Sequence, residues 1–353
     1  MVAAKSTIFT AAFVVAISLA LWLGASKVAE ARDEIRVVGS STVFPFSTAV
    51  AEEFGQTTDY KTPVIEATGT GGGLKLFCAG VGVSHPDIAN ASRRIKASEV
   101  RNCAKNGVLE IIEVKIGFDG IILANSKAAP MAQLTLRQVW LALAKQVPAA
   151  GQMIDNPYQS WADIDANLPA VRIEVLGPPP TSGTRDAFVE LAMEGGCKTF
   201  AEIKALKKSD KAAYKAACHA IREDGAYVEA GENDNLIVQK LVTNPKALGI
   251  FGFSFLEQNR DRIQGSIIDG VVPEFDTISG GAYPVSRSMY FYVKSAHTGV
   301  IPGIEEFIAA FMDEEASGTY GYLTDKGLIP LSDAEREAVL AAALALTPLI
   351  LPN

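Results

Sequence analysis

The sequence predicts an α/β fold built around a mainly parallel sheet. Short β-favouring runs alternate along the chain with helical patterns, and this order is typical of parallel strands joined by crossover helices. The chain has 353 residues, of which 48% are hydrophobic and 20% charged. This composition is that of an ordinary globular protein, and the length is sufficient for two lobes. The sequence contains no internal repeat and no low-complexity linker.

Residues 1–31 form a predicted signal peptide. Lys5 supplies a positive charge, residues 8–23 are almost entirely apolar, and Ala29-Glu30-Ala31 has the small-x-small pattern of a signal-peptidase site. We therefore expect a mature chain that begins near Arg32 and lies in the periplasm. The alternative is an uncleaved N-terminal anchor, because the apolar stretch can be extended through Ser26 to span a bilayer. The bulk of the protein is exported in both cases.

The first third of the mature chain reads as strands that each run into a turn. Helical patterns begin near residues 45 and 74, after the first two strands. Gly117-Phe118-Asp119 is expected to form a β-turn between two further strands, because glycine and aspartate are typical turn residues. The predicted strands cover residues 35–38, 64–67, 87–91, 111–114 and 120–124.

The remainder of the chain continues the alternation. Helix and loop are expected over 134–168, and an apolar tail at 338–351 is expected to pack on the body because Pro348 interrupts it. Strands are predicted at 172–176, 248–255 and 289–293. Helices are predicted at 186–193, within 197–225, and at 235–242, 303–313, 316–327 and 333–344.

The four cysteines form two local pairs in the sequence. Joining Cys78 to Cys103 and Cys197 to Cys218 closes only short loops, which is the least costly of the three ways to pair four cysteines. An oxidising compartment would preserve such disulfides, and free buried thiols are the alternative. A zinc site is disfavoured because the sequence has no CxxC pair and its three histidines are far apart. We expect no metal and no cofactor.

The charge balance excludes one class of partner. Residues 1–31 contain two lysines and one glutamate, so that 30 basic and 39 acidic residues remain without them. A phosphate-rich polymer would be repelled, and no basic run of the kind found in nucleic-acid-binding proteins is present. A small anion could still bind if local dipoles attracted it.

Three segments share a design that suits a small anion. In each, a strand runs into a Gly/Ser/Thr turn and a helix follows: Gly39–Thr42, Gly69–Gly73 and Thr181–Thr184. The first N–H groups of a helix lack intrahelical acceptors, and the helix dipole adds partial positive charge there. These helix starts are expected at the carboxyl edge of the sheet, which is where ligands bind in open α/β folds. Each segment taken alone is more often an N-cap or tight turn.

Charged side chains accompany these segments. Arg185 lies in the first turn of a predicted helix and can form a bidentate contact with an oxyanion, or else a surface ion pair. Arg93, or equally Arg94, follows a strand end and Ser92. An ionised Asp119 would repel any oxyanion that has no proton to donate, and would thereby select phosphate over sulfate. A plain turn role for Asp119 is an equal alternative.

These segments resemble the phosphate-binding protein of ABC-type phosphate importers, a periplasmic binding-protein family. The resemblance runs from about Glu34 to Leu328. It rests on 39–45 (Gly-Ser-Ser-Thr-Val-Phe-Pro), 69–73, 87–93, 118–120, 182–185, 232–235 (Glu-Asn-Asp-Asn) and 283–287 (Tyr-Pro-Val-Ser-Arg).

The resemblance implies a two-lobed periplasmic-binding-protein fold of type II with the ligand cleft between the lobes. One lobe would comprise 32–122 with 288–353, and the other 123–287. Hinge closure would follow binding, and the closed protein would dock onto membrane permease subunits. The implied phosphate-binding residues are Thr42, Val43, Thr70, Ser92, Arg93, Ser182, Gly183, Thr184 and Arg185, to which the reasoning above adds Ser41 and Asp119.

Two positions depart from the family. Some members carry aspartate where Ser92 stands, and Asp119 is our substitute for it. Some carry a basic residue where Pro178 stands, so Arg185 would have to supply that charge.

Other functions remain open at this point. Sulfate, molybdate or phosphonate are rival ligands, and a binding module without a transport role, such as a phosphate sensor, would have the same sequence features. A secreted phosphatase has less support, because the sequence has no GxSxG, no HExxH and no histidine near a candidate nucleophile. We therefore expect a monomeric binding protein and no enzyme.

Overall fold

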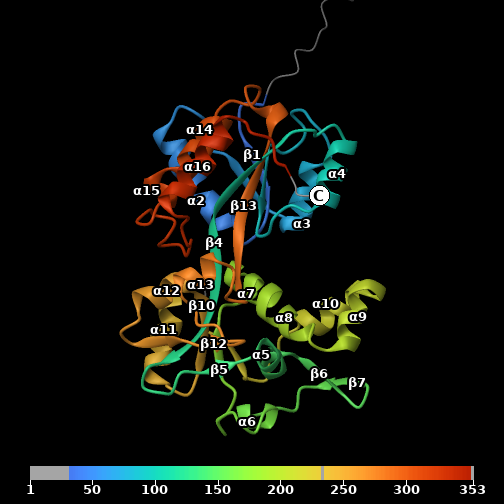
Figure 1. Ribbon diagram of the computed structural model, residues 1–353, viewed down its shortest axis with the longest axis vertical. Coiled ribbons are helices and arrows are strands. Elements are labelled where there is room, and N and C mark those ends of the chain that lie inside the picture. Colours follow the sequence, from blue (N-terminus) through green and yellow to red (C-terminus); the bar gives the residue numbers. More distant parts are fainter. Residues whose placement is uncertain (1–31, 232–233, 351–353) are drawn as a thin grey trace, which may run out of the picture.

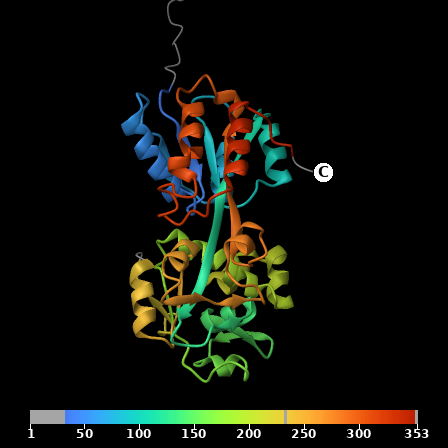
Figure 2. The same cartoon turned by 60° about the vertical axis from the view of Figure 1, so that its left-hand side comes forward.

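The protein consists of two α/β lobes joined by two long strands, β4 (Ile111–Ser126) and β13 (Ser286–Lys294) (Figure 1). The computed structural model describes residues 32–231 and 234–350. A view turned by 60° shows the same two strands passing between the lobes (Figure 2). The predicted α/β class and two-lobed arrangement are confirmed. The predicted signal peptide, residues 1–31, lies outside the described residues.

The sheet of the first lobe has the strand order β2-β1-β3-β13-β4. β1 (Arg36–Gly39) pairs in parallel with β2 (Val64–Ala67) and β3 (Ile88–Ala91). The turns that follow these three strands therefore lie along one edge of the sheet. The helices of this lobe are α2 (Phe44–Thr57), α3 (Thr70–Phe77), α4 (Ala97–Lys105), α14 (Ile304–Met312), α15 (Glu314–Ser317) and α16 (Asp333–Leu344).

The second lobe continues the sheet from β4 through β10 (Leu248–Gly252), β8 (Val175–Gly177) and β9 (Tyr227–Glu229). β8 pairs in parallel with β9 and β10, and each antiparallel pair of this sheet includes β4 or β13. The helices along this part of the chain are α5 (Leu136–Leu143), α6 (Trp161–Ile164), α7 (Gly183–Phe188), the π-helical η1 (Val189–Met193), α8 (Glu194–Cys197), α9 (Ala201–Ser209), α10 (Lys211–His219), α11 (Asp234–Thr243), α12 (Phe253–Gln258) and α13 (Phe275–Ser279).

The prediction of two strands with a turn at Asp119 is wrong. β4 is one continuous strand of 16 residues, and Asp119 lies within it, opposite Arg287 of β13. Gly117 is needed here because its φ is 148° and because a Cβ would lie 2.5 Å from the carbonyl oxygen of Ile329. We propose the predicted lobe boundaries, 32–122 with 288–353 and 123–287, which fall inside β4 and β13.

Several predicted element boundaries also differ. The Gly-rich segment forms the first turn of α3, which begins at Thr70 and not near residue 74. The strand predicted at 248–255 ends at Gly252, where α12 begins. Of the helix predicted at 316–327 only residues 316 and 317 are helical, as the end of α15, since Gly318 and Gly321 favour turns. The predicted strand at 172–176 is β8, and 134–168 also contains a hairpin of β6 (Gln146–Ala149) and β7 (Gln152–Asp155).

Both predicted disulfides are present. Cys78 at the end of α3 is bonded to Cys103 of α4, and Cys197 of α8 is bonded to Cys218 of α10. The apolar tail packs on the body as predicted, where Leu349 N–H donates to the Ile111 carbonyl at 2.7 Å.

Residues 32–231 and 234–350 contain neither a membrane-spanning helix nor a cluster of metal-ligating side chains. None of the helices in these ranges combines the length and apolar character that crossing a membrane requires. These ranges also contain no group of three or more His, Cys, Asp or Glu side chains placed to hold a metal ion.

Candidate functional site

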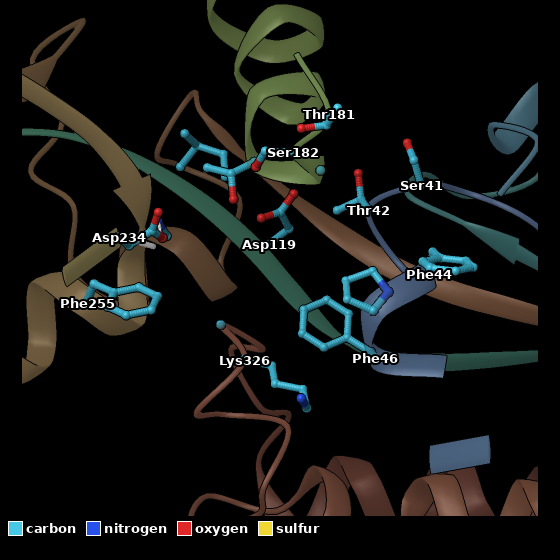
Figure 3. Close-up of a pocket in the computed structure, with 16 residues that line it drawn as sticks. Ser41, Thr42, Phe44, Phe46, Asp119, Thr181, Ser182, Asp234, Phe255 and Lys326 are labelled. Carbon is cyan, nitrogen blue, oxygen red and sulfur yellow. Dashed lines mark hydrogen bonds between the residues drawn. The ribbon is translucent and has the colours of Figure 1, made fainter. Parts of the chain in front are cut away.

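A cavity of about 300 Å³ lies between the lobes, beside the crossover strand β4. Ser41 and Thr42, which precede α2 of the first lobe, line one side. Ser182, Gly183 and Thr184 at the start of α7 line the opposite side. Figure 3 shows the Asp119 carboxylate between Ser182 and Thr42. The structure therefore brings two of the three predicted helix starts to one cavity.

The two helix starts supply hydrogen-bond donors to this cavity. Ser182 is the N-cap residue of α7, but its side chain makes no capping hydrogen bond, which leaves the hydroxyl available to a ligand. α7 continues without a break through η1 and α8, so its dipole is that of a longer helix. Val43 is fully buried and can offer only its N–H group, which lies 3.4 Å from Ser40 Oγ.

The lobes touch directly beside the cavity. Ser41 Oγ donates a hydrogen bond of 2.8 Å to Asp186 Oδ2 of α7. A Cβ added at Gly183 would lie 3.3 Å from the carbonyl oxygen of Ser41, which is closer than most side chains come to a neighbour. The absence of a side chain at Gly183 therefore allows α7 to approach the Ser41–Thr42 turn.

Arg287 of β13 was not singled out from the sequence as a site residue, yet it contacts two residues that line the cavity. Its Nη2 donates to Thr42 Oγ1 at 2.7 Å, and its Nε donates to Asp119 Oδ2 at 3.2 Å. Its Nη1 donates to Glu190 Oε2 of the second lobe at 2.6 Å. The side chain of Arg287 is 10% exposed, so most of its charge is shielded from water.

Two buried carboxyl groups line the cavity. Burial raises the pKa of Asp119, and the positive charge of Arg287 opposes that increase. Asp234, the first residue of α11, was also missed as a site residue. Burial raises the pKa of Asp234 to about 6, and a long hydrogen bond of 3.4 Å from Gly252 N–H opposes the increase.

The remaining lining is mainly apolar. Phe46, Ile121 and Phe255 contribute hydrophobic surface, and Lys326 places a cation near the cavity from an exposed loop position (Figure 3). The cavity thus combines hydroxyl and amide donors with two acidic groups and a limited apolar wall.

Thr70 and Ser92 lie at the same edge of the first lobe's sheet but are outside the lining of this cavity. Their hydroxyl oxygens are 3.1 Å apart, and Ser92 N–H donates to Thr70 Oγ1 at 3.1 Å. α3 reaches this edge because Gly73 packs on Gly39, where a Cβ would come within 2.3 Å of the Gly39 Cα.

The two predicted arginines point elsewhere in this structure. Arg93 forms a two-pronged ion pair with Glu99 of α4, with N–O distances of 2.7 and 2.9 Å. Arg185 donates from Nη1 to the Pro178 carbonyl at 3.1 Å, and its guanidinium lies 4.2 Å from the ring centroid of Tyr227. Neither side chain lines the cavity.

Comparison with known proteins identifies the fold family. A family model described as the PBP superfamily domain matches residues 24–315. The chain belongs to the PBP superfamily.

Individual relatives have been given more specific names. Protein SphX of Synechococcus elongatus is 31% identical over 72% of this chain and 66% of its own length. Phosphate-binding protein PstS of Staphylococcus saprophyticus is 26% identical over 84% of this chain and 80% of its own length. A solved structure of a possible phosphate binding protein from Planctomyces limnophilus has a TM-score of 0.70 and 26% identity, and the match covers 88% of this chain and 97% of that one.

The sequence contained only a weak signal for the two missed residues. Arg287 and Asp234 both lie in segments that carried the family resemblance. Neither follows the strand–turn–helix pattern that marked the other candidates. Their place at the cavity depends on pairing between β4 and β13 and on the packing of α11, which no local pattern reveals.

Proposed function

We propose that this protein binds inorganic phosphate between its lobes and delivers it to the membrane permease subunits of an ABC-type importer. The names of its relatives support this proposal, as does the order of motifs along the chain. The observation that carries it is that Ser41–Thr42 of one lobe and Ser182–Thr184 of the other line a single cavity at two helix starts. Helix N-termini of this kind are well suited to a small oxyanion.

Donors from both lobes would surround the anion. Thr42 and Val43 contribute partly through backbone N–H groups, and the hydroxyls of the other residues rotate to meet the phosphate oxygens. Arg93 and Arg185 reach the anion only after leaving Glu99 and Tyr227, so their contacts form as the ligand binds. The proposed ligand-binding residues are Ser41, Thr42, Val43, Thr70, Ser92, Arg93, Asp119, Ser182, Gly183, Thr184 and Arg185.

Asp119 would distinguish phosphate from sulfate. Phosphate carries a proton at neutral pH that an ionised carboxylate can accept, whereas sulfate has none and would be repelled. The Asp119 side chain is 11% exposed, so water would do little to weaken that repulsion.

The protein acts outside the cytoplasm as a carrier of its ligand. It works as a monomer outside the cytoplasm, where an oxidising environment preserves its two disulfides. It binds and releases its ligand without chemical change, needs no cofactor and does not bind nucleic acid. Lobe closure on the anion presents the bound state to the permease.

Calorimetric titration of phosphate-stripped protein tests the function. We expect phosphate to bind with a Kd of about 1 μM or below, and sulfate, molybdate and methylphosphonate to bind much more weakly. Phosphate binding no tighter than that of the other oxyanions would contradict the assignment, and sulfate binding equal to phosphate would remove the role of Asp119. Steady hydrolysis of a chromogenic phosphate ester would show an enzyme instead.

Arg185 offers a second test at a single residue. Arg185→Ala should weaken phosphate binding by about tenfold or more, because a charge-assisted contact is lost. Arg101→Gln, which removes one exposed positive charge on α4, is the control and should bind as the wild type does. Unchanged affinity of Arg185→Ala would mean that Arg185 stays against Tyr227.

A further inference from the structure

Arg287 has a role that can be read from the atoms it contacts. It lies on β13 directly opposite Asp119 of β4, and both residues are held by the pairing of the two crossover strands. The guanidinium contacts Thr42, Asp119 and Glu190 with three different nitrogen atoms. Thr42 and Asp119 line the cavity, whereas Arg287 itself stands behind them.

The contact with Thr42 determines the direction of the hydroxyl proton. Thr42 Oγ1 accepts a hydrogen bond of 2.7 Å from Arg287, and arginine has no acceptor to offer in return. The Thr42 O–H must therefore point to another acceptor. Since Thr42 is 7% exposed and lines the cavity, an oxyanion there is well placed to receive this hydrogen bond.

The contact with Asp119 favours the ionised form of the carboxyl. A carboxyl as buried as Asp119 tends to keep its proton, and a protonated Asp119 could donate a hydrogen bond to sulfate and would no longer repel it. The permanently charged guanidinium at 3.2 Å favours the ionised form. Glu190 is a half-exposed third partner on the outer side, where water weakens its effect on the pair.

We propose that Arg287 is a positioning residue that makes Thr42 a donor and Asp119 an acceptor, and so sets the preference of the site for a protonated oxyanion. This inference rests on the proposed phosphate site. Arg287 also supplies a fixed positive charge near the cavity. This chain has Pro178 where some members of the family it resembles have a basic residue. Arg287 does not itself have to touch the ligand.

The ratio of phosphate to sulfate affinity tests this role. In Arg287→Gln, Asp119 should become protonated and Thr42 should lose its fixed direction. We expect phosphate binding to weaken by about tenfold or more, and sulfate binding to come within about tenfold of phosphate binding. Arg287→Lys keeps the positive charge but not the fork of donors, so it should weaken phosphate binding while retaining the preference over sulfate.

A double variant keeps the test valid if the single variant does not fold. Arg287→Gln with Asp119→Asn removes both members of the ion pair and leaves no unpaired buried charge. It should fold, as judged by circular dichroism, and bind phosphate and sulfate about equally. Arg101→Gln serves as the control for loss of one positive charge.

The outcomes separate this inference from the proposed function. Wild-type protein that binds no phosphate would overturn the function, and with it the inference. Wild-type protein that prefers phosphate, together with an Arg287→Gln variant that keeps the same preference, would overturn the inference alone. The same result in the double variant would overturn the inference and also remove the selective role of Asp119. Loss of affinity with an unchanged preference would likewise reject it, because a purely structural role predicts that result.

Discussion

Burial raises the pKa of both carboxyl side chains that line the cavity, but different partners oppose the increase. Burial raises the pKa of Asp119, and the positive charge of Arg287 beside it opposes that increase. Asp234 is 7% exposed and receives only a long hydrogen bond from Gly252 within the described part of the chain. Burial therefore raises the pKa of the Asp234 carboxyl above its ordinary value, to about 6.

The raised pKa of Asp234 predicts a pH dependence of stability. Between the unfolded pKa of Asp234, 3.8, and the folded value of about 6, the folded protein binds a proton that the unfolded chain lacks. The stabilisation is complete below that window and is lost as the pH rises through it. Asp234→Asn should therefore match the wild type near pH 4 and become more stable by up to roughly 3 kcal/mol at pH 7, at 1.36 kcal/mol per pKa unit.

Urea unfolding at pH 4, 5, 6 and 7 measures this effect. Asp59→Asn, at an exposed position, is the matched control for loss of one carboxylate. A stability gap between Asp234→Asn and the wild type that does not change with pH would mean that burial does not control the Asp234 proton.

At the scale of elements, the α9–α10 hairpin depends on its disulfide more than on a core. α9 buries only Ile203, and α10 buries Tyr214 and Cys218. Both helices have nine residues, a length at which an isolated helix is marginal in water. The bond from Cys197 to Cys218 closes this segment at its base.

Removal of that disulfide should destabilise the protein. Replacing both Cys197 and Cys218 by Ala should lower the free energy of unfolding by about 3 kcal/mol. The reason is that the loop between these two residues is no longer closed in the unfolded chain, which gains conformational entropy. Denaturant unfolding measures the change. Phosphate affinity should stay as in the wild type, since neither cysteine lines the cavity. Equal stability of variant and wild type would show that packing alone holds the hairpin.

Closure is a property of the whole molecule, because the proposed site exists only where the lobes meet. The lobes meet at the hydrogen bond between Ser41 and Asp186 and at the narrow space beside Gly183. The contacts available to a ligand therefore depend on the distance between the lobes. A ligand that uses donors from both lobes binds the closed arrangement more tightly than an open one, and it therefore shifts the population toward the closed arrangement.

A side chain at Gly183 should oppose closure without unfolding either lobe. Gly183→Val should weaken phosphate binding by about tenfold or more, because the competent closed state becomes less populated. Gly183→Ala should have a smaller effect, since its Cβ would be 3.3 Å from Ser41 O. Small-angle scattering should show that phosphate compacts the wild type but not Gly183→Val. Wild-type affinity in Gly183→Val would disprove the link between this contact and binding.

Local patterns in the sequence determined the α/β alternation, the three turn–helix segments and the two disulfides. Each depends on residues close together along the chain, where spacing alone constrains geometry. The same reasoning failed at Asp119, because glycine and aspartate that favour turns were held in one long strand by pairing with β13.

Only the tertiary structure decided which charges meet at the cavity. Asp119 and Arg287 are 168 residues apart, and they face each other because two crossover strands pair in one register. Arg185 lies beside its predicted helix start but turns to Tyr227, a partner supplied by another strand. Side-chain direction depends on neighbours that the fold brings in from distant segments, and the sequence does not contain that information in any local form.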